Sequence, residues 1–252
     1  MTPQHALLLG ATRGLGRATA RLFAADGHTV SVIARRRPDP APEDGGGSIR
    51  VWTADLGNAA ALAKALTEIH QERGPVQSMV FFPRFRGDGD AWRGEFETIL
   101  DGARRVIEGL VNQHGFRDGS IVLVSSVNAR LISPKLGLGY HVAKAALNQM
   151  VRYYAVALGP KGIRINSVSP GTFLKDETRA ALLADGKLER LSREIVPLGR
   201  VGTAEEVASV IRFLCSPDAS FVTGQDLVVD GGVSLQFQEA LATAWDPGRP
   251  GN

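Results

Sequence analysis

Short apolar runs alternate with longer segments of helical periodicity along most of the chain. Almost every position in the short runs is apolar, a pattern typical of parallel strands that are buried on both faces. The helix-like segments between them would cover the two faces of the sheet. The predicted strands are residues 6–9, 29–34, 49–52, 78–82, 120–125, 164–168 and 226–229. The predicted helices are residues 16–25, 59–72, 95–113, 139–158 and 204–214.

This alternation predicts an α/β protein with a single-domain Rossmann fold, a doubly wound parallel sheet with helices on both faces. The chain has 252 residues, of which 44% are hydrophobic, enough for one sizeable core. One domain is therefore expected over residues 1–236, followed by a tail over 237–252. Residues 37–48 and 83–94, rich in Gly, Pro or charged side chains, are predicted to be loops within that domain.

Charge and cysteine content narrow the possible partners. The 29 basic and 26 acidic residues are interspersed along the chain, which favours neither a nucleic-acid nor a membrane partner. Cys215 is the only cysteine, so the chain has no intrachain disulfide framework and no cysteine-rich metal site, and a cytoplasmic location fits best. The apolar run at residues 6–10 is too short for a membrane span and lacks signal-peptide features. The five histidines show no metal-ligand spacing, so no metal is expected.

A glycine-rich turn follows the first predicted strand and leads into a helix. Glycines at such a place permit a tight reversal, close approach of the backbone to a pyrophosphate and close packing of helix on strand, while helix N–H groups face the anion. A chance glycine turn is the alternative, because three spaced glycines alone are a weak signal. The residues predicted to bind a dinucleotide here are Gly10, Thr12, Arg13, Gly14, Leu15 and Gly16.

Arginines follow the second predicted strand, where an acidic residue would select NAD(H). Arg35 and Arg36 can pair with the 2′-phosphate of NADP(H), and Arg13 can add a second cation. NADP(H) is therefore favoured over NAD(H), with a solvated loop edge as the alternative for these arginines. After the third strand, Asp55 and Leu56 are predicted to contact adenine, although Asp55 could equally cap the helix that begins near Asn58.

Tyr140 and Lys144 lie four residues apart in a predicted helix and therefore project from one face. An ammonium beside a phenol stabilises the phenolate and favours acid/base exchange with a substrate oxygen. Ser126 closes the fifth strand at the carboxyl edge of the sheet, where ligands bind, and can hydrogen-bond a developing alkoxide. A structural role is the alternative for each residue taken alone. His141, beside Tyr140, is predicted to lie on the helix surface.

These motifs together resemble the short-chain dehydrogenase/reductase family, in its compact single-domain branch that includes the 3-oxoacyl-carrier-protein reductases. The resemblance extends over residues 6–232 and includes the glycine turn, the Ser126, Tyr140 and Lys144 set, the run from Asn166 to Gly171, and the stretch 197–232. It implies an NADP-dependent enzyme that interconverts a carbonyl and an alcohol on a small or carrier-bound substrate.

The family resemblance also assigns roles to individual residues. It implies that Tyr140 is the proton donor or acceptor, that Lys144 contacts the nicotinamide ribose and the tyrosine, and that Ser126 binds the substrate oxygen. Pro170, Gly171 and Thr172 would border the nicotinamide, and residues 172–196 would form a substrate lid. A homotetramer or homodimer is similarly implied.

Two departures from the family pattern lie close to the predicted site. The family's Asn-Asn-Ala-Gly run is absent, and Arg84 and Arg86 lie on the loop that replaces it, either reaching an anionic substrate group or solvated. The helix asparagine that anchors a proton-relay water in many members is also missing from residues 98–101. A dinucleotide-binding sensor or scaffold with little turnover is therefore the alternative function.

Overall fold

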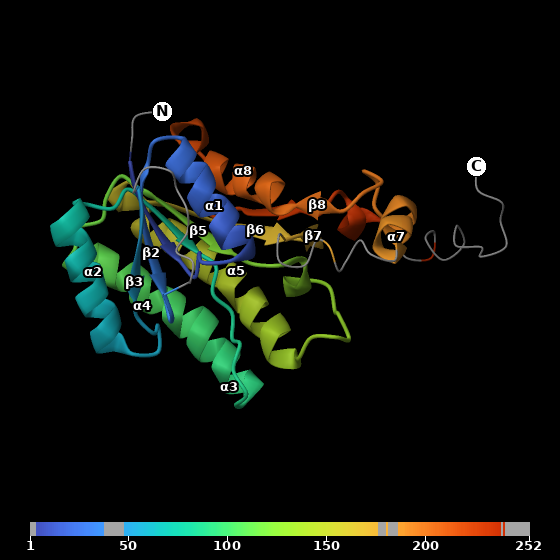
Figure 1. Ribbon diagram of the computed structural model, residues 1–252, viewed down its shortest axis with the longest axis horizontal. Helices are drawn as coiled ribbons and strands as arrows, with labels where there is room; N and C mark the ends of the chain where they lie inside the picture. Colours follow the sequence, from blue (N-terminus) through green and yellow to red (C-terminus); the bar gives the residue numbers. More distant parts are fainter. Residues whose placement is uncertain (1–3, 38–47, 176–179, 181–185, 238, 240–252) are drawn as a thin grey trace.

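The computed structural model describes residues 4–37, 48–175, 180, 186–237 and 239. Its main sheet has seven parallel strands in the order β3-β2-β1-β4-β5-β6-β9, which confirms the predicted doubly wound Rossmann fold (Figure 1). The strands are β1 (His5–Leu9), β2 (Thr29–Ala34), β3 (Ile49–Thr53), β4 (Ser78–Phe81), β5 (Ser120–Val124), β6 (Arg164–Pro170) and β9 (Asp226–Val229). Each begins and ends within two residues of the predicted position.

Helices cover both faces of this sheet (Figure 1). One face packs against α1 (Gly14–Ala25) and α8 (Ala204–Cys215), and the other packs against α2 (Ala59–Arg73), α4 (Gly102–Gln113) and α5 (Leu138–Leu158). Successive side chains of a strand point to opposite faces, so β1 contributes to both cores. Among the described residues, no helix combines the length and apolar composition that crossing a membrane requires.

The helix predicted over residues 95–113 begins earlier than expected and is interrupted. A short helix α3 (Ala91–Glu95) leads into a π-helical turn over Phe96–Asp101 before α4 begins. The predicted loop 83–94 was therefore too long, because the Asp90 side chain accepts hydrogen bonds from Trp92 N and Arg93 N and starts α3. Residues 38–47 of the other predicted loop lie outside the described residues.

The predicted lid includes two small elements. Strand β7 (Phe173–Leu174) pairs with β8 (Gly202–Thr203), and helix α7 (Lys187–Ile195) lies between them in the chain. Residues 176–179 and 181–185 of the lid lie outside the described residues, as does most of the predicted tail.

Replacing Leu123 on β5 tests how much the central strand contributes to stability. Leu123 is fully buried, so Leu123→Ala leaves a cavity and should lower the free energy of unfolding by about 2–5 kcal/mol. Leu138→Ala makes the same change at a side chain that is 71% exposed, and should cost less than about 0.5 kcal/mol. Urea denaturation measures both; similar losses in the two variants would contradict the described core.

Candidate cofactor and active site

The carboxyl ends of the strands bring most of the predicted site residues to one edge of the sheet. The glycine turn follows β1, Arg35 follows β2, Ser126 follows β5 and Gly171 follows β6. In the strand order, β2 and β3 follow outward from β1 on one side, whereas β5, β6 and β9 follow outward from β4 on the other. The order in which strands are added therefore reverses between β1 and β4, although all seven strands are parallel. Such a reversal opens a crevice at the carboxyl edge, the usual ligand site of an open α/β sheet.

The turn after β1 has the backbone geometry of a phosphate cradle. Gly10 and Gly14 have φ angles of +78° and +49°, in the left-handed region that favours glycine. A Cβ on Gly16 would lie 2.5 Å from the Cα of Ala11, so only glycine lets α1 begin this close to β1. Arg13, the N-cap residue of α1, is exposed and makes no side-chain cap hydrogen bond. This close approach of β1 to the start of α1 is the geometry that the predicted dinucleotide-binding turn requires.

The segment after β4 replaces the family's asparagine run with a different contact. A Cβ on Gly10 would lie 3.3 Å from Cγ of Pro83, so the proline ring packs directly against the glycine turn. The loop after β4 and the turn after β1 are thus in contact without an asparagine.

The structure separates the two alternatives for Asp55. The N-cap of α2 is Asn58, whose side chain accepts from Ala61 N at 3.0 Å, so the cap interpretation of Asp55 was wrong. Asp55 Oδ1 instead accepts from Gly57 N at 2.8 Å and shapes the turn before the helix. Leu56 is buried in the core, and its carbonyl accepts from Arg105. Arg35 and Arg36 are exposed at the end of β2.

Lys144 is buried at the end of β5. Its Nζ donates a 2.6 Å hydrogen bond to the carbonyl of Val124, the last residue of that strand. Burial lowers the pKa of Lys144 to about 7, the Glu95 carboxylate acts in the opposite direction, and Arg84 lowers the pKa further. A lysine with a pKa near neutral pH can exchange a proton or retain its charge according to what binds beside it.

Tyr140 lies next to Lys144, as the four-residue spacing predicts. The Lys144 Nζ is 5.8 Å from the centroid of the Tyr140 ring, and the guanidinium carbon of Arg84 is 4.8 Å from it. Tyr140 is half-buried and packs against the core on the α5 face. The phenol ring therefore lies within about 6 Å of two basic side chains.

Ser126 is the buried N-cap of a short 3₁₀ turn over Val127–Ala129, and its Oγ accepts from Asn128 N at 3.1 Å. Val124, the partner of Lys144, is only two residues before it. In the described part of the chain, no hydrogen bond joins the hydroxyls of Ser126 and Tyr140. Both hydroxyl protons therefore remain available to a third group.

His141 is buried, which corrects the prediction that it lies on the helix surface. Its Nε2 accepts from Ser133 N at 3.0 Å, and its Nδ1 lies 3.0 Å from the carbonyl of Gly137. Nδ1 must therefore carry the proton. The histidine ties the loop before α5 to the first turn of that helix, directly beside Tyr140.

Two buried carboxylates near the site were missed in the sequence. Glu95, at the end of α3, is 5% exposed and accepts from Phe85 N at 3.0 Å. The sequence signal for Glu95 was its spacing of four residues from the apolar Ile99, which is buried. This spacing puts the carboxylate on the apolar face of a helix, where a charged group needs a partner. Asp226 on β9 accepts from Ser167, Ser169, Asn148 and Arg130 and fastens the strands β6 and β9 to α5 and to the loop after Ser126.

The end of β6 is closely fitted to the segment after β9. Gly171 N donates to Val229 O at 3.0 Å, and a Cβ on Gly171 would lie 2.7 Å from Cβ of Asp230. Pro170 is buried and Thr172 is exposed. The backbone predicted to border the nicotinamide is thus held by the last strand.

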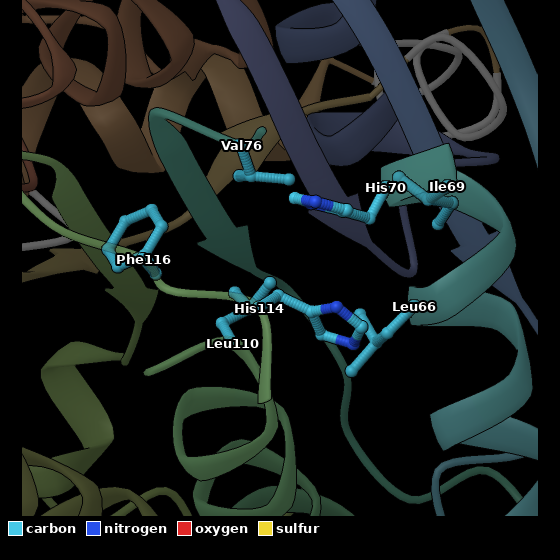
Figure 2. Close-up of a pocket in the computed structure, with 7 residues that line it drawn as sticks. All are labelled: Leu66, Ile69, His70, Val76, Leu110, His114 and Phe116. Atoms are coloured by element: carbon cyan, nitrogen blue, oxygen red, sulfur yellow. The ribbon is translucent and has the colours of Figure 1, made fainter. Parts of the chain in front are cut away.

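A small apolar pocket lies at the opposite edge of the sheet, between α2 and α4 (Figure 2). It contains the ring pair of His70 and His114, whose centroids are 5.4 Å apart. The described residues hold no group of three or more side chains arranged to ligate a metal. None of the residues that line this pocket is among the predicted site residues.

The comparison with known families agrees with this geometry. A family model described as enoyl-(acyl carrier protein) reductase matches residues 10–234. The chain belongs to the short-chain dehydrogenase/reductase family, as the motifs predicted.

Individual relatives differ in what their names state. The chain is 35% identical to protein FixR of Bradyrhizobium diazoefficiens, over 92% of this chain and 87% of that protein. It is also 35% identical to L-rhamnose 1-dehydrogenase (NAD(P)(+)) of Azotobacter vinelandii, over 92% and 97% respectively. Ligand-free aldohexose dehydrogenase of Thermoplasma acidophilum superposes with a TM-score of 0.79 at 27% identity, over 93% of this chain and 95% of that one.

The pKa of Lys144 predicts how stability depends on pH. An unfolded lysine titrates near ~10.4, so between about pH 7 and 10 the unfolded chain holds a proton that folded Lys144 lacks, and stability rises with pH. The free energy of unfolding of the wild type, relative to Lys144→Met, should therefore increase by up to about 1.4 kcal/mol per pH unit between about pH 7.5 and 9.

Urea denaturation of both proteins across this range makes the measurement. Other titrating groups, including the buried Cys215, are common to the two proteins and cancel in the difference. Parallel pH curves would show that the ammonium is not buried.

Proposed function

We propose that this protein is an NADP(H)-dependent oxidoreductase that interconverts a carbonyl and an alcohol, with Tyr140 as its general acid/base. The observation that supports this most is the buried Lys144 Nζ held 5.8 Å from the Tyr140 ring centroid, at the sheet edge that also bears the glycine turn. Relatives named as dehydrogenases agree with the reaction class.

The residues of the crevice fit a nicotinamide dinucleotide. The turn with positive φ at Gly10 and Gly14, together with the start of α1, suits a pyrophosphate. Gly10, Thr12, Arg13, Gly14 and Leu15 would line that group, Asp55 and Leu56 would border the adenine, and Pro170, Gly171 and Thr172 would border the nicotinamide. When bound, the nicotinamide exchanges a hydride with the substrate carbon.

We infer a preference for NADP(H) from the arginines after β2. Arg35 and Arg36 are exposed and can turn toward a 2′-phosphate, which a guanidinium binds with two parallel hydrogen bonds. The name of the Azotobacter relative includes both cofactors, so the choice rests on these arginines alone.

Three side chains would act on the substrate oxygen. Tyr140 donates its phenolic proton as the carbonyl becomes an alcohol, and takes it back in the reverse direction. The Lys144 ammonium stabilises the phenolate that remains, and Ser126 hydrogen-bonds the developing alkoxide. No hydrogen bond to another described residue occupies the hydroxyl of Tyr140.

The substrate is proposed to be a small-molecule or carrier-bound carbonyl compound, covered by a lid over residues 172–196. A homotetramer or homodimer is supported by apolar side chains exposed on α5 and around the end of α8, namely Tyr153, Val156, Phe213 and Phe221. The single, buried Cys215 supports a cytoplasmic location.

A dinucleotide-binding sensor or scaffold is the second candidate. The absence of both family asparagine features favours it. A sensor needs the glycine turn but does not need the proton of Tyr140. Removing that proton therefore separates the two functions.

Arg35→Ala should weaken NADPH binding by about tenfold or more while changing NADH binding little, because only NADPH has a phosphate for the guanidinium. Fluorescence titration with each reduced cofactor measures the dissociation constants. Arg37→Ala, two residues further along the same exposed segment, is the matched control. Equal losses for the two cofactors would refute the assignment of Arg35.

Tyr140→Phe should reduce carbonyl reduction by about 10²-fold or more and leave the dissociation constant of NADPH unchanged, because only the transferable proton is lost. Tyr153→Phe removes a hydroxyl from an exposed tyrosine on the same helix and should have no effect. Activity is followed as oxidation of NADPH with a panel of carbonyl compounds. Undiminished turnover in Tyr140→Phe would exclude the proposed mechanism.

A further inference from the structure

Arg84 lies against the ring of Tyr140 rather than in solvent. Its guanidinium carbon is 4.8 Å from the ring centroid, and the residue is partly buried, whereas Arg86 on the same loop is exposed. The sequence offered the same two alternatives for Arg84 and Arg86, and the structure places only Arg84 beside Tyr140.

The Nε of Arg84 is buried and has no hydrogen-bond partner among the described residues. A guanidinium is a planar fork of N–H donors whose geometry matches a carboxylate or a phosphate. Buried polar groups in folded proteins almost always have a partner, so an unpaired donor beside the phenol points to a ligand.

The loop holds Arg84 in this position from both sides. Pro83 packs against Gly10 of the phosphate turn, and Phe85 donates its N–H to the buried Glu95. The Phe85 ring lies over Gly94, where a Cβ would come within 2.4 Å of it. The position of Arg84 is therefore built by its neighbours in the chain.

The charged groups around Tyr140 carry a net positive charge while Lys144 is protonated. Arg84 and Lys144 are the two cations, and Glu95 is the carboxylate whose charge acts on Lys144. On the neighbouring elements, His141 bonds the loop before α5, and Asp226 pairs with Arg130. While Lys144 is protonated, two cations therefore face one carboxylate, and an anionic ligand group would compensate the excess charge.

We propose that Arg84 recognises an anionic group, a carboxylate or a phosphate, on the substrate whose carbonyl oxygen meets Tyr140. This inference rests on the proposed function and adds a substrate class to it: carbonyl compounds with an acidic group within a few bonds of the carbonyl. Because the guanidinium lies over the ring that serves the carbonyl, one substrate can reach both residues.

The test uses carbonyl compounds in matched pairs, each as the free acid and as its methyl ester, for example 2-oxo acids and formylbenzoates. Wild-type kcat/KM should be higher for the acid than for the ester by about tenfold or more. Arg84→Gln should abolish this preference, because kcat/KM for the acid should fall about tenfold or more beyond any change for the ester. Arg84→Lys should restore part of the preference, and Arg86→Gln should retain all of it.

Several results would overturn the inference. Equal turnover of acid and ester by the wild type across the pairs is the simplest. An equal loss for acid and ester in Arg84→Gln would make Arg84 a positioning residue for Tyr140. A weaker NADPH complex in Arg84→Gln, with the acid preference intact, would place the anion on the cofactor.

Binding provides a second readout if no pair is turned over. The acids should then bind the NADPH complex of the wild type more tightly than their esters, measured as a change in NADPH fluorescence, and Arg84→Gln should remove the difference. Equal binding of acids and esters overturns the inference. Failure of the wild type to bind NADPH at all refutes the proposed function itself, and the inference falls with it.

Discussion

The burial of one ammonium group at the end of a strand is the constraint on which the site depends. Lys144 satisfies its buried charge through the Val124 carbonyl and the nearby Glu95 carboxylate, so β5, α5 and α3 must keep fixed positions relative to one another. Tyr140 lies one turn earlier on α5 and is therefore held beside the ammonium. The same arrangement brings the loop after β4 over the phenol through Phe85 and Glu95. The residues around Lys144 thus contribute to the packing, to the compensation of its charge and to the proposed chemistry.

The fold was predictable because its signals are local and repeated. Apolar runs such as residues 29–34 are typical of inner strands, and the glycines between β1 and α1 have a backbone geometry that other residues rarely adopt. The spacing of Tyr140 and Lys144 likewise predicts their proximity. Asp55 was ambiguous because a turn and a helix cap use the same residue types, and only the structure assigns the cap to Asn58.

The remaining features could not be predicted because they depend on contacts between distant segments. Whether His141 is buried depends on the path of the loop before α5, which Ser133 N and Gly137 O reveal. The placement of Arg84 depends on the next residue, Phe85, which lies on the loop after β4 and contacts Gly94 and Glu95 of α3. The loss of the family's asparagine run is accordingly a replacement of one set of contacts by another, with Pro83 against the phosphate turn and a guanidinium beside the phenol.

The most direct measurement is the pKa of Lys144 itself. The chain has six lysines, so ¹³C-lysine labelling yields few NMR signals, and Lys144→Arg identifies the one that belongs to Lys144. We predict that this signal titrates at about pH 7 in the cofactor-free protein. If all six lysines titrate near ~10.4, the value for a solvated ammonium, Lys144 is not the buried charge around which this site is organised.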